Sequence, residues 1–129
     1  MNEKSGYQQF QEDWEHEAGK ESAMFDHLPV PELLERINSG RHGDYYTIWY
    51  SLARKASLAE AARPLFDVVS SQADYLIRYH AAAALILLGG EALSGWEPVM
   101  LSGEERYPVR ENLAKVELIL KAMLDERVR

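Results

Sequence analysis

One short pattern recurs three times along the chain and constrains its fold more than any other feature. It consists of Tyr, any residue, Ile or Val, three residues, Leu or Ala, and then Ala. Its copies are YTIWYSLA (46–53), YLIRYHAA (75–82) and YPVRENLA (107–114). The Ile or Val positions are 29 and 32 residues apart (48 to 77, 77 to 109). A repeat at this period indicates a supersecondary unit that is copied along the chain.

Each copied unit is expected to be a pair of helices. Helical spacing of apolar residues recurs through most of the chain, whereas the two-residue alternation of a strand never lasts. Asp44, Ser57 and Asp74 are candidate N-caps. Pro31, Pro64 and Pro98 recur at spacings of 33 and 34 residues in alternate segments. The sequence therefore predicts helices over residues 31–37, 44–56, 57–70, 74–88, 91–101 and 108–124.

Burial explains why such pairs are repeated. A two-helix hairpin has too little interior to be stable alone and must stack on a neighbour. Ile48 and Leu52, four residues apart, lie on one helical face. The small residues Ala53, Ala82 and Ala114 are expected to let adjacent helices approach closely. This pattern favours an all-α stack of hairpins, an α-solenoid.

The sequence resembles the HEAT and armadillo-like repeat proteins. Residues 75–85, YLIRYHAAAAL, are similar to the second helix of a HEAT unit, in which Val-Arg precedes an Ala/Leu-rich face. Ile77-Arg78 and Val109-Arg110 match that dipeptide, and Ile48-Trp49 departs from it. The resemblance covers roughly residues 31–124. It implies a short right-handed α-α superhelix of about three helix pairs that binds proteins and carries no catalytic residues.

Two other helical architectures compete with this interpretation. A tetratricopeptide array has a similar period, but its expected Trp, Gly and Tyr positions are missing from residues 31–40 and 57–70. An unrelated helical bundle would leave the threefold repeat unexplained.

Residues 1–27 are predicted to form an acidic amphipathic arm, and residues 28–129 the repeat domain. The arm holds seven acidic and two basic residues, so it carries −5 of the net charge of −7. Tyr7, Phe10 and Trp14 fall at i, i+3 and i+7, on one stripe of a helix. We expect this stripe to cap the first helix pair. Docking on a partner, or on a second copy to give a weak homodimer in place of a monomer, is the alternative.

Composition and charge narrow the classes of function. The chain of 129 residues has no cysteine, and therefore no disulfide and no thiolate metal site. Its start lacks the apolar core of a signal peptide, and the longest apolar run, residues 81–88, is far short of the ~20 residues that cross a bilayer. A cytoplasmic protein without membrane contact is expected. The acidic balance disfavours nucleic acid as a partner and favours a basic protein.

No pattern predicts an enzyme, a cofactor or a metal site. His16 has no second histidine four residues away, and His42 lies in the glycine-containing turn GRHG. The carboxylates at 12, 13, 15 and 17 follow no EF-hand spacing, which favours a solvated helix face. Phosphate-binding loops, dinucleotide fingerprints and nucleophile elbows are all missing.

The candidate protein-binding residues come from the second helix of each pair, which the resemblance places on the inner curve of the array. Equivalent positions form two rows, the first of Tyr46, Tyr75 and Tyr107 and the second of Tyr50, Tyr79 and Glu111. Arg54, Arg78 and His80 lie beside them. Tyrosine is favoured at binding hot spots. The alternative is that the rings cement the joints between repeats.

Three functions are compatible with this reading. The first is a non-catalytic module that inhibits a basic toxin or enzyme, as immunity proteins do. The second is an adaptor or regulatory scaffold subunit of a cytosolic complex. The third is a nucleic-acid enzyme similar to HEAT-like DNA glycosylases, which would need a basic surface built from the cations that cluster in sequence: Arg36, Arg41, Arg54, Lys55 and Arg63.

Overall fold

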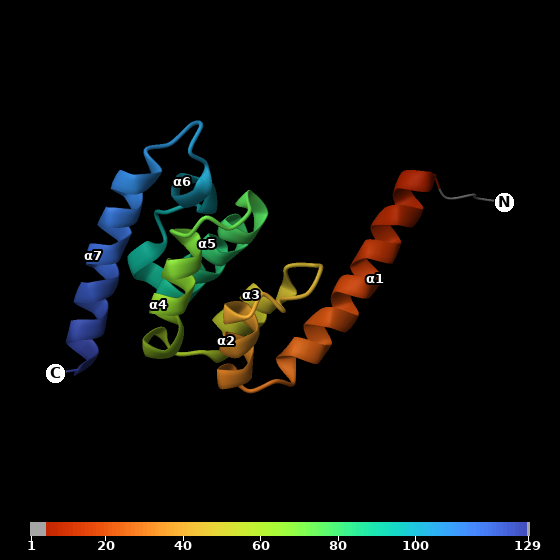
Figure 1. Cartoon of the computed structure of the whole chain (residues 1–129), viewed down its shortest axis with the longest axis horizontal. Helices are drawn as coiled ribbons and strands as arrows, with labels where there is room; N and C mark the ends of the chain where they lie inside the picture. Colours follow the sequence, from red (N-terminus) through yellow and green to blue (C-terminus); the bar gives the residue numbers. More distant parts are fainter. Residues whose placement is uncertain (1–4, 129) are drawn as a thin grey trace. The chain divides into compact units, whose positions relative to one another are not determined.

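The computed structural model describes residues 5–128, and every element in this part of the chain is helical (Figure 1). The all-α prediction is therefore confirmed. The elements are α1 (Gly6–Asp26), α2 (Val30–Asn38), α3 (Thr47–Lys55), α4 (Leu58–Val69), α5 (Tyr75–Gly89), the 3-10 helix η1 (Gly90–Leu93), α6 (Pro98–Ser102) and α7 (Val109–Val128). The chain divides into two compact units between Ser51 and Leu52, within α3. The predicted boundary between residues 27 and 28 stays a prediction.

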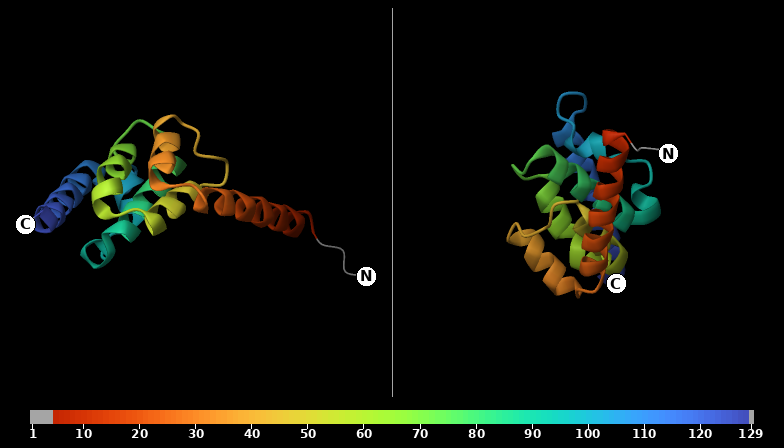
Figure 2. Two further views of the ribbon diagram at one scale, coloured as in Figure 1. Left: turned by 90° about the horizontal axis from the view of Figure 1, so that it is seen from below. Right: turned by 90° about the vertical axis from the view of Figure 1, so that its right-hand side faces the viewer.

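In the first unit, α1 is one continuous helix that runs through Gly19 without a break. A capping box fixes its start: the Ser5 hydroxyl accepts a hydrogen bond from the Gln8 amide at 3.1 Å, and the Gln8 side chain accepts one from the Ser5 amide at 3.0 Å. Only Phe25, near the other end, is buried. Figure 2 shows that the first half of α1 extends beyond α2 and α3.

The start of α3 differs from the prediction. The helix begins at Thr47, three residues after the expected N-cap Asp44. A distant carboxylate supplies the cap instead. Glu21 of α1 accepts hydrogen bonds from the Asp44 amide at 2.6 Å, the Tyr45 amide at 3.2 Å and the Thr47 hydroxyl at 2.6 Å. The Thr47 amide, which the start of α3 would otherwise leave unpaired, also donates to Glu21, at 3.4 Å. The Asp44 and Tyr45 amides belong to the loop before the helix, so the same carboxylate anchors that loop.

In the second unit, α4 begins as the sequence predicts. Ser57 and Glu60 form a capping box, with the Ser57 hydroxyl accepting from the Glu60 amide at 3.2 Å and the Glu60 carboxylate accepting from the Ser57 amide at 2.9 Å. The helix buries a broad face composed of Leu58, Ala61, Ala62, Leu65, Phe66 and Val69. Pro64 lies within the first two turns of α4, and the helix continues past it.

The predicted helix over residues 91–101 is wrong. The chain forms η1, a turn through Gly95 and Trp96, and then the short α6. Pro98 is the first residue of α6, and Glu97 before it is extended, with φ −111° and ψ 148°. Proline disfavours helical geometry in the residue that precedes it, and Glu97 adopts the extended geometry that ends the helix, whereas Arg63 before Pro64 stays helical within α4.

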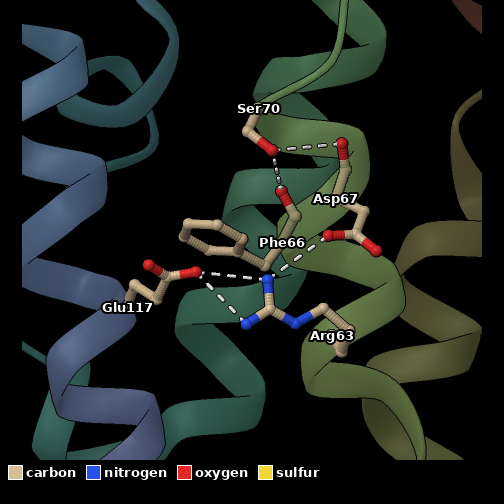
Figure 3. Close-up of polar contacts among 5 residues, drawn as sticks. All are labelled: Arg63, Phe66, Asp67, Ser70 and Glu117. Atoms are coloured by element: carbon tan, nitrogen blue, oxygen red, sulfur yellow. Dashed lines mark hydrogen bonds and ion pairs between the residues drawn. The ribbon is translucent and has the colours of Figure 1, made fainter.

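The helices of the second unit pack as neighbours along the chain and also across it. The α5 helix packs against α4 and α6, α6 packs against α7, and α7 also contacts α4. Arg63 of α4 donates to Glu117 of α7 at 3.2 Å and to Asp67 at 3.5 Å (Figure 3). The Arg63 guanidinium also lies 5.2 Å from the centre of the Phe66 ring. Hydrogen bonding to Glu117, the largest influence, raises the pKa of Arg63 above its ordinary value, so the guanidinium stays charged.

The repeated positions are buried to different degrees. Ile48 and Leu52 are fully buried, and so is Ala81, whereas Ile77 is half-buried. Ala114 is exposed. The expectation that a small residue at 114 admits a neighbouring helix is therefore wrong, because that position of α7 faces solvent.

By length and composition, Tyr75–Leu93 is the one segment of residues 5–128 that could cross a membrane, with a mean hydropathy of 1.3. Five of the α5 residues in this segment are buried, namely Ala81, Ala82, Ala84, Leu85 and Gly89. Because α5 packs against α4 and α6, these apolar residues form part of the interior of the second unit, which explains their hydropathy without a membrane.

Candidate functional site

The start of α5 presents aromatic and cationic side chains together. Tyr75 and Tyr79 are four residues apart, and their ring centres lie 6.0 Å from each other. The Arg78 guanidinium lies 6.0 Å from the centre of the Tyr75 ring. Tyr75 is exposed and Tyr79 is half-buried. We call Tyr75, Arg78 and Tyr79 the α5 face.

Arg78 is held in one position by groups from two parts of the second unit. Its Nε donates to the Ala73 carbonyl at 2.9 Å, and Nη1 donates to the Ser102 carbonyl at 3.3 Å and to the Glu104 carboxylate at 2.9 Å. The Arg78 side chain is 13% exposed, whereas that of Glu104 is 68% exposed. The arginine is therefore fixed by backbone groups, and its carboxylate partner lies at the surface.

A cavity of about 490 Å³ opens beside this arginine. Tyr75, Arg78 and Val99 line it together with the turn from Ser102 to Arg106. A second depression of about 300 Å³ is lined by Tyr107 and Glu111 among others, and Glu104 lines both. The structure thus brings four predicted site residues, Tyr75, Arg78, Tyr107 and Glu111, around Glu104.

His80 lies next to the α5 face. Its ring meets that of Tyr79 edge-on, with centres 5.4 Å apart. Burial lowers the pKa of His80 below its ordinary value of 6.5. A lowered pKa keeps the imidazole neutral at neutral pH, so His80 adds no charge to this region.

The remaining predicted residues lie elsewhere in the sequence. Tyr46 and Tyr50 belong to the first unit and are half-buried. Tyr46 has a φ of +61°, in the left-handed region, immediately before α3. Arg54 is exposed in the last turn of α3. A continuous row of tyrosines through all three repeats therefore stays a prediction.

Sequence reasoning missed Glu104, which lies at the centre of this arrangement. It occupies the turn between α6 and α7. Helical periodicity predicts the positions of residues within helices only, so it does not predict that a turn residue contacts Arg78. The one available signal is its position three residues before the predicted Tyr107.

Metal binding and nucleic-acid binding depend on side chains outside the α5 face. Within residues 5–128, no three His, Asp or Glu side chains gather in a way that could hold a metal ion. Cations of the cluster in the sequence form ion pairs with carboxylates: Arg36 with Glu32, Arg41 with Glu35, and Arg63 with Asp67 and Glu117. A comparison of the chain with protein-family models, curated proteins and solved structures finds no match.

Proposed function

We propose that this chain is a non-catalytic protein-binding module that inhibits a basic protein, such as a toxin or an enzyme. The observation that carries the proposal is the α5 face beside its cavity, with Tyr75 and Arg78 as the contact residues. Tyrosine and arginine are the residue types, with tryptophan, that most often dominate the binding energy of protein interfaces.

The rigidity of the α5 face supports this role. Arg78 is already immobilised by two backbone carbonyls, and the tyrosines lie on a helix that packs against α4 and α6. Because these side chains are already ordered, binding of a partner costs little conformational entropy, and more of the contact energy contributes to affinity.

The charge of the chain supports a basic partner. The net charge of −7 attracts cationic proteins at long range and speeds their association. Arg36, Arg41 and Arg63 pair with carboxylates, so their charges are partly neutralised and less able to bind phosphates. A nucleic-acid enzyme is therefore the least supported of the three functions.

The proposed architecture behind this function is a short HEAT-like superhelix. Its support is the threefold sequence repeat and the packing of successive helices, α4 on α5 and α6 on α7. The cytoplasm is the proposed location. An adaptor that holds two partners in a cytosolic complex is the alternative function of the same architecture.

The test is to purify the tagged full chain with its partner from the native host and to measure affinity after substitution. We expect a basic partner, bound more weakly as salt is raised. Tyr75→Ala and Tyr79→Ala, both in the α5 face, are expected to weaken binding at least about tenfold, or roughly 1.4 kcal/mol, with an unchanged melting temperature. Leu87→Ala, at an exposed residue of the same helix, is the matched control and keeps full affinity.

Three results would contradict the proposal. A neutral or acidic partner bound independently of salt favours the adaptor. Retention of the chain on a DNA column at low salt favours the nucleic-acid enzyme. General unfolding of the tyrosine variants shows that the rings cement the helices together.

A further inference from the structure

The first half of α1 exposes a row of aromatic side chains. Tyr7 is 74% exposed, Phe10 63% and Trp14 40%. The Phe10 and Trp14 ring centres are 6.2 Å apart, so the row is continuous along the helix. Isolated exposed apolar residues are common, but three aromatic residues on one stripe of one helix indicate a contact surface. We call these three residues the α1 stripe.

Local interactions keep this part of α1 helical without burial. The capping box of Ser5 and Gln8 fixes the first turn, and the Gln9 side chain donates to Asp13 at 2.9 Å. Side-chain pairs at this spacing stabilise a helix in isolation. The α1 stripe is therefore presented on a helix that is already formed, and a partner need not supply the energy of folding it.

The far end of the α1 stripe has a neighbour within the first unit. The Trp14 ring meets the Tyr45 ring edge-on, with centres 4.7 Å apart. Tyr7 and Phe10 are the more exposed members. The free part of the stripe is therefore its first half, and these two rings are the anchors open to a partner.

The charge around the α1 stripe selects the kind of partner. Residues 5–17 contain Glu12, Asp13, Glu15 and Glu17 and no Lys or Arg. On a 100° wheel these carboxylates lie on both flanks and on the back of the stripe. A second copy would bring the same negative charges together, which disfavours self-association. A groove edged by Lys and Arg complements them.

We infer that α1 is a docking helix whose Tyr7 and Phe10 insert into an apolar groove, edged by Lys and Arg, on another protein. Amphipathic helices bind grooves in this way through anchors at i, i+3 and i+7. The inference deepens the proposed function, on which it rests for a basic partner. It adds a contact from the first unit that is separate from the α5 face.

The probe is a labelled helical peptide of Leu and Lys, with the leucines at helical spacing so that an apolar stripe is edged by lysines. Fluorescence anisotropy measures its binding to the full chain. We expect Tyr7→Ala and Phe10→Ala each to weaken binding at least about tenfold. Leu118→Ala is the matched control, because Leu118 is 67% exposed on α7, and it is expected to bind like the wild type. A scrambled peptide of the same composition is expected to bind at least about tenfold more weakly.

The outcomes separate this inference from its competitors and from the proposed function. Equal binding by Phe10→Ala and the wild type, or equal binding of the scrambled peptide, overturns it, since charge alone then explains the association. Phe10-dependent dimers in sedimentation, or Phe10-dependent binding to phosphatidylcholine vesicles without peptide binding, also overturn it. Circular dichroism of the variants checks that α1 stays helical. Peptide binding that survives Tyr79→Ala supports it even where the proposed function fails.

Discussion

Helices α1 and α4 begin with the same device and differ in what covers their apolar faces. Each has a serine N-cap that forms a capping box with the third helical residue, Gln8 in α1 and Glu60 in α4. From there α4 buries six side chains, whereas α1 buries only Phe25 and leaves Tyr7 and Phe10 exposed.

This difference teaches that a cap signal reports where a helix starts and not what it packs against. The face of α4 is made of Leu, Ala, Val and Phe, with small residues that let α5 approach. The stripe of α1 is aromatic and is surrounded by carboxylates that interior packing would have to desolvate. Burial of α4 and exposure of α1 follow from the residues around each stripe.

The largest expected effect on the free energy of unfolding comes from a substitution in α4, the buried helix of the two. Leu65→Ala removes a fully buried side chain from α4 and is expected to lower the free energy of unfolding by about 2–5 kcal/mol. Phe10→Ala in α1 is expected to change it by no more than about 0.5 kcal/mol. Urea unfolding followed by circular dichroism measures both. Similar losses for the two variants would show that the first half of α1 is buried in solution.

A second variant tests how the far end of α1 is attached. Glu21→Ala leaves the amides of Asp44 and Tyr45 and the hydroxyl of Thr47 without their shared acceptor. We expect a loss of about 1–3 kcal/mol in the stability of the first unit. Hydrogen exchange of the α3 amides measures it.

The control for this experiment is Glu17→Ala, which removes a surface carboxylate from the same helix. The Glu17 side chain is 48% exposed and pairs with Lys20 at 3.4 Å, an interaction expected to contribute little. Equal exchange in the two variants would contradict a capping role for Glu21.

The two capping boxes allow a direct comparison of smaller effects. Ser57→Ala is expected to cost about 1 kcal/mol of the global stability of the second unit, because α4 is part of its interior. Ser5→Ala is expected to increase fraying of the first turn of α1 and to leave the melting temperature unchanged. Thermal melting and amide exchange measure the two results, and a fall in melting temperature for Ser5→Ala would contradict the second.

The smallest effect concerns His80 in α5. Because its folded pKa is lowered, the unfolded chain binds the proton more tightly. The contribution of His80 to stability is fully present above its unfolded pKa of about 6.5 and is lost as the pH falls through that value toward the folded pKa. Melting temperatures at about pH 7.5 and about pH 5.5 are expected to differ more for the wild type than for His80→Gln. If the melting temperatures of the wild type and His80→Gln change equally between the two pH values, His80 is not the source of the pH dependence.

Sequence reasoning recovers the parts of the fold that depend on neighbouring residues. The sequence predicts the helices near 31–37, 57–70 and 74–88 because Pro31, Ser57 and Asp74 mark their starts locally. The start of α3 was misplaced because its cap comes from Glu21, which is 23 residues before Asp44. The helix across 91–101 failed because the backbone preference imposed by Pro98 on Glu97 outweighs the apolar pattern.

The candidate site shows the same limit. The sequence predicts that Tyr75, Arg78 and Tyr79 lie together, because their spacing places them close to one another on a helix. Glu104 and the carbonyl of Ser102, which hold Arg78 in place, come from the end of α6 and the turn after it, more than twenty residues away along the chain. Side chains that meet only after folding have no local signature, so the cavity beside Arg78 could not be predicted.

The attachment of Glu21 to the loop before α3 also restricts how this sequence can evolve. Gly43 has a φ of +79°, and a methyl group added there would overlap the Glu21 carboxylate. Substitution at position 43 alone would displace the carboxylate, and loss of the carboxylate alone would leave the loop without its anchor. Gly43 is therefore restricted twice, by its backbone angle and by the Glu21 carboxylate, and position 43 should tolerate substitution less well than position 21.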